Sequence, residues 1–170
     1  MQLDAGLCRV RDWRRSDRGS LVRCADNRNV WRNLGHRFPH PYTPADADAW
    51  LAYVRGTPGC AQWAIEVDGL AVGGIGIEPG EGIFAKCARF GYWLGEPWWG
   101  RGIATAAASA TADYVLERFD LVRLEAAVFE WNPASMRVLE KAGFEREAVL
   151  KRSVWKDGRI IDAVLYARLR

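Results

Sequence analysis

The stretch from Gly91 to Phe119, GYWLGEPWWGRGIATAAASATADYVLERF, constrains the fold more than any other part of the sequence. An extended aromatic segment runs into Gly100-Arg101-Gly102, and an alanine-rich run follows directly. The apolar residues from Ile103 to Arg118 are spaced as one face of a helix. Glycine is unfavourable at the start of a helix unless the backbone there must be free of side chains. The stretch therefore predicts a strand, a glycine turn and a helix, with a ligand or another segment close to the turn.

The rest of the sequence alternates between strand and helix patterns, without an internal repeat or a linker. Hairpin turns are expected at Asp68-Gly69 and at Lys156-Asp157-Gly158. Strand patterns cover residues 7–13, 61–67, 70–77, 86–94, 123–130, 147–155 and 160–169, and helix patterns cover 16–30, 43–56, 103–118 and 132–143. This order, β-αα-βββ-α-β-α-ββ, predicts a single α/β (α+β) domain over residues 1–170, with a mixed sheet of about seven strands and about four flanking helices.

Three of the predicted helices carry signals at their ends. Ser16, Thr43 and Asn132 are N-cap candidates, and the last two are each followed by proline, which suits the first helical position. Gly56 and Gly143 are expected to end two of these helices. On the strand at 123–130, alternate apolar residues predict one buried face.

Composition excludes several classes of protein. With 49% hydrophobic and 26% charged residues, the chain reads as a soluble globular protein. No apolar run approaches the ~18 residues of a membrane span, and the first residues lack the apolar segment of a signal peptide, so we expect a cytoplasmic protein with no membrane partner. The net charge is +3, and the basic residues form no dense stripe along the chain, which argues against nucleic-acid binding. The four cysteines are scattered without a C-x-x-C pair, which predicts reduced thiols and no metal site.

The glycine turn before the helix raises the question of a phosphate site. A P-loop needs Gly-Lys-Ser/Thr, which the sequence lacks. A dinucleotide fingerprint needs a third glycine where Thr105 stands, and it opens a βαβ unit, whereas the segment before this turn is a meander. The sequence therefore disfavours both motifs.

A pyrophosphate site at the start of the helix is the third alternative. Unpaired N–H groups and partial positive charge at a helix N-terminus favour an anion. Gly100 and Gly102 would let the backbone approach the ligand, and Arg101 would add charge at the rim. A plain tight turn packed on the sheet explains the same residues. This stretch alone does not decide between the two.

Two blocks of the sequence resemble the Gcn5-related N-acetyltransferase (GNAT) superfamily. In the first, Trp99-Gly100-Arg101-Gly102-Ile103-Ala104 falls on the acetyl-coenzyme A loop Q/R-x-x-G-x-G/A. The second, FEWNPASMRVLEKAGFERE, matches N-x-x-S followed by a basic residue and Gly-Phe. Trp99 departs from the general loop, but an aromatic before Gly-Lys/Arg-Gly is frequent in the RimJ/RimL-like branch. FPHPYTPADADAWL and KDGRIIDAVLYARL also resemble that branch, so the resemblance covers most of the chain.

The resemblance implies transfer of an acetyl group from acetyl-coenzyme A, a cosubstrate, to a primary amine by direct attack in a ternary complex. It implies a strongly twisted sheet whose strands at 86–94 and 124–129 splay apart around the thioester. Backbone groups near Trp93 and Leu94 would pair with the pantetheine arm, and the N–H of Leu94 would be the oxyanion donor. The residues implied to bind the coenzyme are Trp93, Leu94, Trp99, Gly100, Arg101, Gly102, Ile103, Ala104, Thr105, Asn132, Ser135 and Lys141.

The resemblance also bears on proton transfer. Ser135 matches the serine that similar enzymes use as general acid, although a serine at a helix start can simply cap the backbone. Other branches use a tyrosine seven residues after the asparagine as the general acid, and Leu139 at that position closes this option here. Arg89 and Val154 replace two carboxylates that serve relatives as bases, so the base is unknown. Remaining candidates are Glu78, Glu96 and Glu125, or positioning with an ordered water.

The acceptor is expected between the loop at 29–43 and the turn after Trp155. Trp31, Phe38 and Tyr42 would wall a slot for a peptide or an amine, and His36 and His40 are either bases or ordinary loop residues. A protein N-terminus competes with a small amine such as a polyamine or an aminoglycoside. Few clustered carboxylates are present, which favours a peptide or a weakly cationic amine. A non-catalytic acyl-coenzyme A-binding module is the rival interpretation, and a homodimer is left open.

Overall fold

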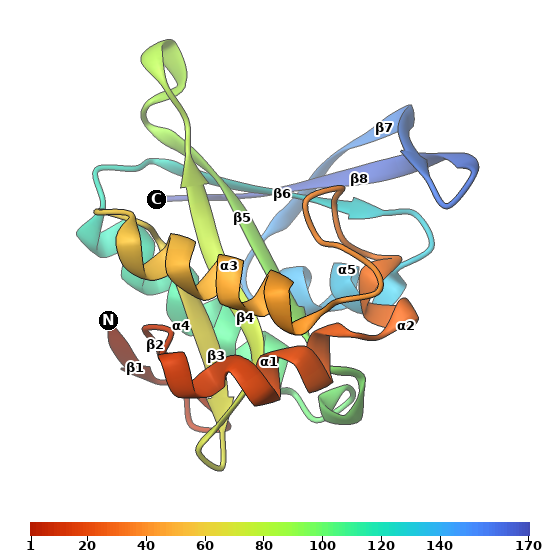
Figure 1. Cartoon of the computed structure of the whole chain (residues 1–170). Helices are drawn as coiled ribbons and strands as arrows, with labels where there is room; N and C mark the ends of the chain where they lie inside the picture. Colours follow the sequence, from red (N-terminus) through yellow and green to blue (C-terminus); the bar gives the residue numbers. More distant parts are fainter.

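The computed structural model describes all 170 residues. Its centre is one mixed sheet of eight strands in the spatial order β1-β2-β3-β4-β5-β6-β8-β7 (Figure 1). Every neighbouring pair is antiparallel except β5 and β6, which run parallel. The strands are β1 (Gln2–Asp4), β2 (Arg9–Arg11), β3 (Gln62–Val67), β4 (Leu70–Pro79), β5 (Cys87–Leu94), β6 (Arg123–Phe129), β7 (Glu145–Lys156) and β8 (Arg159–Leu169).

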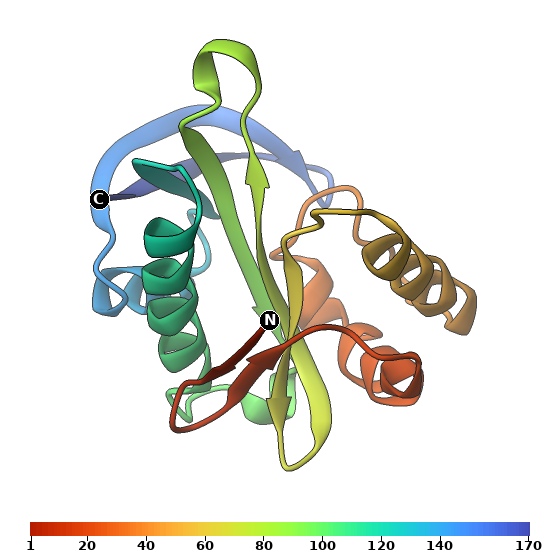
Figure 2. The same cartoon turned by 90° about the vertical axis from the view of Figure 1, so that its left-hand side faces the viewer.

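Helices cover both faces of the sheet (Figure 2). The α4 (Ile103–Arg118) and α5 (Pro133–Lys141) helices lie on one face, and α1 (Arg18–Ala25), α2 (Arg28–Trp31) and α3 (Pro44–Gly56) lie on the other. Short 3-10 turns occupy Arg15–Asp17, Gly82–Phe84 and Glu96–Trp98. None of the helices combines the length and the apolar character that crossing a bilayer requires. The predicted α+β fold with a mixed sheet is confirmed, with one strand more than expected.

The N-terminal segment differs from the prediction. The strand expected at 7–13 is only the three-residue β2, and it pairs with β1, which the alternation pattern does not reveal. The helix expected at 16–30 is broken into a 3-10 turn, α1 and α2. Ser16 does not cap it, because Ser16 lies inside the 3-10 turn and α1 begins only after Asp17, whose carboxylate accepts the N–H of Arg14 at 2.7 Å. The second break follows from Asn27, whose side-chain oxygen accepts the N–H groups of the next turn and starts α2.

The other local signals are confirmed. Thr43 and Asp46 form a reciprocal capping box at the start of α3, with N–H···O distances of 3.3 Å and 2.8 Å. Asp68 and Gly69 join β3 to β4 with φ angles of 50° and 78°, the left-handed conformation of a tight hairpin turn. The same device, at Asp157 and Gly158, joins β7 to β8.

The apolar core has one part on each face of the sheet. The larger part lies under α4 and α5 and includes the buried face of β6, on which Leu124, Ala126 and Val128 point inward as predicted. The smaller part lies under α1 and α3 and includes Trp13 and Tyr42. The sheet is therefore held from both sides, which fixes the strands that border the site.

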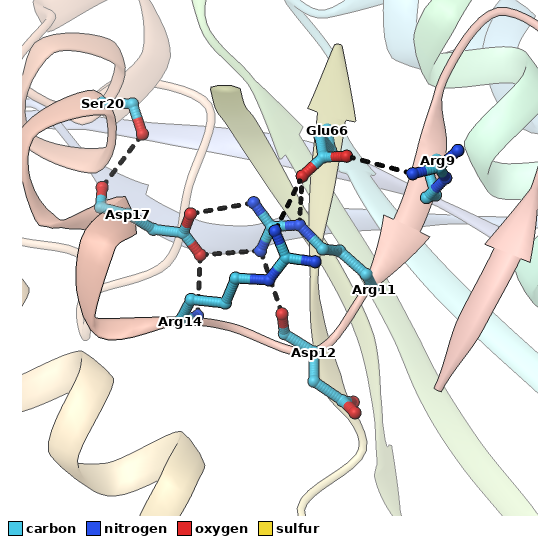
Figure 3. A network of polar contacts seen from close by, with 7 residues as sticks. All are labelled: Arg9, Arg11, Asp12, Arg14, Asp17, Ser20 and Glu66. Atoms are coloured by element: carbon cyan, nitrogen blue, oxygen red, sulfur yellow. Dashed lines mark hydrogen bonds and ion pairs between the residues drawn. The ribbon is translucent and has the colours of Figure 1, made fainter. Parts of the chain in front are cut away.

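A buried ionic network joins β2, β3 and the turn before α1 (Figure 3). The guanidinium of Arg11 donates to both carboxylate oxygens of Asp17 at 2.8 Å and also donates to Glu66. All three side chains belong to residues less than one-tenth exposed. Arg9 and Arg14 lie at the edge of the network with longer contacts to Glu66. Charges this far from water are tolerated because each one is paired.

Candidate active site

The strands β5 and β6 separate halfway along their length. They pair only at Cys87–Arg123, Ala88–Leu124 and Arg89–Glu125. Beyond these pairs β5 continues along β4 to Leu94, while β6 continues along β8 to Phe129. Two neighbouring strands thus part with unpaired edges, which is the splay expected for segments 86–94 and 124–129.

The alternation of hydrogen-bonded and non-hydrogen-bonded pairs between β4 and β5 decides which backbone groups of β5 face the gap. The N–H of Gly95 donates to the carbonyl of Val72 at 2.8 Å, while Leu94 lies opposite Gly73. In an antiparallel ladder this makes Leu94 and Gly73 a non-hydrogen-bonded pair. The N–H and C=O of Leu94 therefore point away from β4 and toward the gap. The indole N–H of Trp99 donates to this carbonyl at 2.7 Å, which leaves the N–H of Leu94 available.

The same alternation corrects part of the prediction. Tyr92, two residues before Leu94, also turns its backbone groups toward the gap, whereas those of Trp93 point to β4. A Cβ added to Gly73 would clash with the carbonyl oxygen of Trp93, which fits this direction. Pairing of a ligand with the backbone is therefore open at Tyr92 and Leu94, and not at Trp93.

The start of α4 presents six consecutive unpaired N–H groups. Gly100 and Gly102 have φ angles of 74° and 77°, which only glycine adopts without strain. No side chain caps the helix, and the N–H groups from Gly100 to Thr105 have no acceptor within the chain. The next N–H, that of Ala106, donates to the carbonyl of Gly102 at 3.0 Å. Adjacent donors at the positive end of a helix dipole form a site for an anion.

A cavity of about 600 Å³ lies in the gap and ends at this turn. Its wall contains three cationic side chains, Arg101, Arg137 and Lys141, and no carboxylate. The guanidinium of Arg101 also stacks on the ring of Trp98 at 5.1 Å. Every residue expected to bind the coenzyme lines this cavity: Trp93, Leu94, Trp99, Gly100, Arg101, Gly102, Ile103, Ala104, Thr105, Asn132, Ser135 and Lys141. The cavity suits a long ligand with several negative charges at one end.

Tyr92 and Ser135 meet across the cavity, and the sequence reasoning missed this pair. The two hydroxyl oxygens lie 2.7 Å apart, and the tyrosine hydroxyl also lies 3.1 Å from the carbonyl oxygen of Ser135. Burial raises the pKa of Tyr92 to about 12, although the hydrogen bond with Ser135 opposes the rise. Tyr92 therefore keeps its proton at any ordinary pH. Its position two residues before Leu94 on the splayed strand was the available sequence signal.

Asn132 is the helix cap that its position predicts. Its side-chain oxygen accepts the N–H of Ser135 at 3.2 Å, which holds Ser135 at the start of α5. The amide nitrogen of Asn132 has no partner within the chain, and the residue lines the cavity. The capping interpretation and a ligand contact are therefore compatible at this residue.

A second cavity, of about 370 Å³, lies against the first. The two share wall residues at Leu34 and Gly35 and along β5 from Phe90 to Trp93. The second cavity is otherwise bounded by the loop between α2 and α3, by Trp50 of α3, and by residues of β3, β4 and β5. A molecule in it would approach the gap from the side opposite α4.

The aromatic residues expected to wall an acceptor slot lie in three different places. Phe38 lines the second cavity and contacts Trp93, with ring centroids 5.4 Å apart. Tyr42 packs beneath it in the smaller core and is only 5% exposed. Trp31 lines neither cavity; it stacks on His40 and carries the ammonium of Lys156 3.7 Å from its ring centroid. Of the three, only Phe38 is placed to touch an acceptor.

The candidate bases are likewise dispersed. Glu78 lines the second cavity, where it is paired with Arg37. Glu96 accepts hydrogen bonds from two asparagines of the α1–α2 segment, at 2.7 Å and 2.9 Å, and lines neither cavity. Glu125 lies 3.5 Å from Arg123 and also lines neither.

The remaining candidate positions show which groups border the second cavity. His36 and Arg89 line it, whereas His40 stacks on Trp31 and Val154 pairs with Ile161 in the C-terminal hairpin. Among carboxylates and histidines, the second cavity therefore has only Glu78 and His36.

Comparison with known proteins gives consistent results. The family model of the acetyltransferase (GNAT) domain matches residues 8–145. The chain is 39% identical over 81 residues to the probable N-acetyltransferase YjcK of Bacillus subtilis, covering 45% of each sequence. It is 28% identical over 135 residues to the L-amino acid N-acetyltransferase AaaT of Escherichia coli, covering 79% of this chain and 81% of AaaT.

Solved structures extend the likeness to the whole fold. The structure of Mycobacterium smegmatis RimJ in complex with CoA-disulfide matches with a TM-score of 0.81 at 29% identity, over 97% of this chain and 83% of RimJ. The match to YjcK, in contrast, spans about half the length of that relative.

Proposed function

The chain belongs to the GNAT acetyltransferase family, and we propose that it transfers an acetyl group from acetyl-coenzyme A to a primary amine. One observation carries the proposal: the cavity that opens where β5 leaves β6 ends at six unpaired N–H groups of the α4 turn. Family members use acetyl-coenzyme A, and the RimJ relative has been solved with a coenzyme A disulfide. We further propose that residues 1–170 act as one catalytic domain.

The coenzyme would be held by backbone and charge. The N–H groups from Gly100 to Thr105 would bind the pyrophosphate, with Arg101, Arg137 and Lys141 neutralising the phosphates from the rim. Backbone groups of Tyr92 and the free amide nitrogen of Asn132 would orient the arm in the gap. When bound, acetyl-coenzyme A supplies a thioester carbonyl. The N–H of Leu94 would then stabilise the negative charge that develops on the carbonyl oxygen.

The Tyr92–Ser135 pair can deliver a proton in one of its two arrangements. Tyr92 has a single proton, so it donates either to the carbonyl oxygen or to the hydroxyl oxygen of Ser135. In the second arrangement the serine proton is free to point into the cavity. We propose that this arrangement is the active one: Ser135 is the general acid that protonates the departing thiolate, and Tyr92 donates a hydrogen bond to the serine oxygen.

The attacking amine must lose a proton on the acceptor side. The second cavity is lined by one carboxylate, Glu78, and one histidine, His36. We assign proton removal to a water molecule bound between the amine and these two side chains. Because Glu78 is already paired with Arg37, positioning of the amine at the gap would contribute more to the rate than base strength.

Replacing Ser135 with alanine is expected to lower kcat at least about 100-fold, which is the lower end of the contribution that general acid catalysis makes. Coenzyme affinity should stay nearly unchanged, because the anion site at α4 is intact. Steady-state thiol release and calorimetric titration with coenzyme A measure the two effects. Ser153→Ala, on the exposed face of β7, is the control. Equal kcat values for the two variants would exclude Ser135 as the acid.

Replacing Gly91 with valine is expected to raise the KM for the amine at least tenfold. A Cβ at Gly91 meets no atom within 4 Å, and its φ is not left-handed, so the fold should tolerate the change. The side chain would project where the two cavities meet. Initial-rate kinetics with varied amine and varied acetyl-coenzyme A measure the effect. A variant that loses coenzyme affinity instead would place this residue on the wrong side of the gap.

The activity itself is tested by thiol release from acetyl-coenzyme A with a panel of peptide N-termini and small amines. Acetylation of at least one class is expected, with a melting temperature raised by coenzyme A alone. If coenzyme A raises the melting temperature but no amine yields thiol, the protein is a binding module and the proposed reaction is wrong. If coenzyme A has no effect on melting, the assignment of the first cavity is wrong as well.

A further inference from the structure

The charges that line the second cavity do not balance. Its charged residues are Arg37, Glu78 and Arg89, together with the titratable His36. Arg37 and Glu78 form an ion pair with each other, whereas Arg89 has no carboxylate within ion-pair distance. Arg89 is the cation of the cavity without an ion pair, because its register partners, Glu78 on β4 and Glu125 on β6, contact Arg37 and Arg123 instead. The cavity thus offers a positive group to whatever enters.

Arg89 lies on the same strand face as the point where the two cavities meet. Side chains two residues apart on a strand share a face, about 7 Å apart along it. Arg89, Gly91 and Trp93 form such a row on β5, and Gly91 belongs to both cavities. A molecule seated over Gly91 would therefore lie within reach of the long Arg89 side chain.

The walls suit a small molecule with an apolar part. Phe38, Trp50 and Trp93 contribute aromatic surface, and the volume of about 370 Å³ is within the range of small-molecule sites. On β4, Gly74 and Gly76 lie directly opposite Trp93 and Gly91 of β5, so these two positions of β4 add no side chain to the cavity.

We propose that the acceptor is a small amine that carries a carboxylate, with the carboxylate bound by Arg89 and the amine directed to the gap at Gly91. This inference rests on the proposed acetyltransferase function and narrows its substrate class. A guanidinium binds a carboxylate through two parallel hydrogen bonds, which fixes orientation as well as charge. A polyamine, in contrast, would meet Arg89 with like charge and find no unpaired carboxylate in the cavity.

The test compares L-phenylalanine with L-phenylalaninamide, which differ only in the carboxylate, and adds spermidine and a tripeptide amide. The wild-type protein is expected to acetylate the amino acid with a kcat/KM at least tenfold above that of the amide, as loss of a charge-assisted pair predicts. Arg89→Gln should bring this ratio close to one without changing the KM for acetyl-coenzyme A. Arg89→Glu should move the preference toward spermidine. Arg55→Gln, an exposed arginine on α3 outside both cavities, is the matched control.

Each outcome separates this inference from the function on which it rests. Equal rates with acid and amide, a preference for spermidine or the peptide, or an unchanged ratio in Arg89→Gln would overturn the inference while the acetyltransferase function stands. Calorimetric titration of the protein, saturated with coenzyme A, with L-phenylalanine adds a readout independent of turnover, and binding should be lost in Arg89→Gln. If no amine in any panel releases thiol, the proposed function fails instead.

Discussion

Valine in place of Gly100 is expected to weaken coenzyme A binding about 100-fold, whereas valine in place of Gly158 should leave it unchanged. The two glycines form a matched pair. Both have a φ of 74°, and a Cβ on either would meet no protein atom within 4 Å. The backbone strain of a β-branched residue is therefore the same at both sites, on the order of 1–2 kcal/mol. Only Gly100 borders the first cavity.

The loss at Gly100 follows from access to the N–H groups of the α4 turn. A side chain there would hold a phosphate away from neighbouring donors, and each hydrogen bond to a charged group contributes about 1.5–3 kcal/mol. Losing one or two such bonds accounts for the expected change. Calorimetric titration with coenzyme A measures it, and thermal melting should show equal destabilisation of both variants. Equal affinities in the two would mean that the turn is structural only. Gly102→Val should also weaken binding, but its Cβ would press on Leu7 at 3.1 Å, so it is the less clean variant.

Methionine in place of Arg11 is expected to lower the free energy of unfolding by about 3–5 kcal/mol. The substitution keeps much of the side-chain volume but leaves Asp17 and Glu66 buried without their partner, and an uncompensated buried charge costs about this much. The loss is a large fraction of the roughly 5–15 kcal/mol that stabilises an ordinary domain. Urea unfolding measures it through the transition midpoint.

Arg18→Met is the control, because it removes the same kind of ion pair at a solvent-exposed position. Arg18 forms an ion pair with Asp48 at 2.7 Å, but both side chains are about half exposed. Exposed ion pairs contribute little, so the midpoint should hardly move. A similar decrease in the free energy of unfolding of both variants would show that the buried network in Figure 3 contributes no more to stability than an exposed ion pair. Replacing Asp17 and Glu66 together with Arg11 by apolar residues should recover part of the lost stability.

What the sequence predicted well depends on residues that are close along the chain. The capping box of Thr43 and Asp46 and the turn at Asp68-Gly69 are each set within four residues. The glycine turn before α4 belongs to the same group, because its two glycines and the following alanines are contiguous. The fold class followed from the order of such local elements.

What the sequence missed depends on residues that only the fold brings together. Arg11 reaches Glu66, 55 positions away, and Tyr92 reaches Ser135, 43 positions away. Strand β1, with three residues, is too short for an alternation pattern to appear. The ionic network also explains the first break of the helix expected at 16–30, since Asp17 is held by Arg11 on β2. Burial of Tyr42 could not be foreseen either, because the loop it lies on reads as exposed.

Strand β5 serves the two cavities with alternate residues. Arg89, Gly91 and Trp93 lie on the strand face that borders the second cavity, while Tyr92 and Leu94 present their backbone groups to the gap beside the first cavity. Of the first set, only Arg89 borders the second cavity alone, so a substitution there leaves the first cavity undisturbed. Under the proposed function, acceptor preference could diversify in evolution, or be redesigned in the laboratory, at this position while the cavity for the acetyl donor is inherited intact.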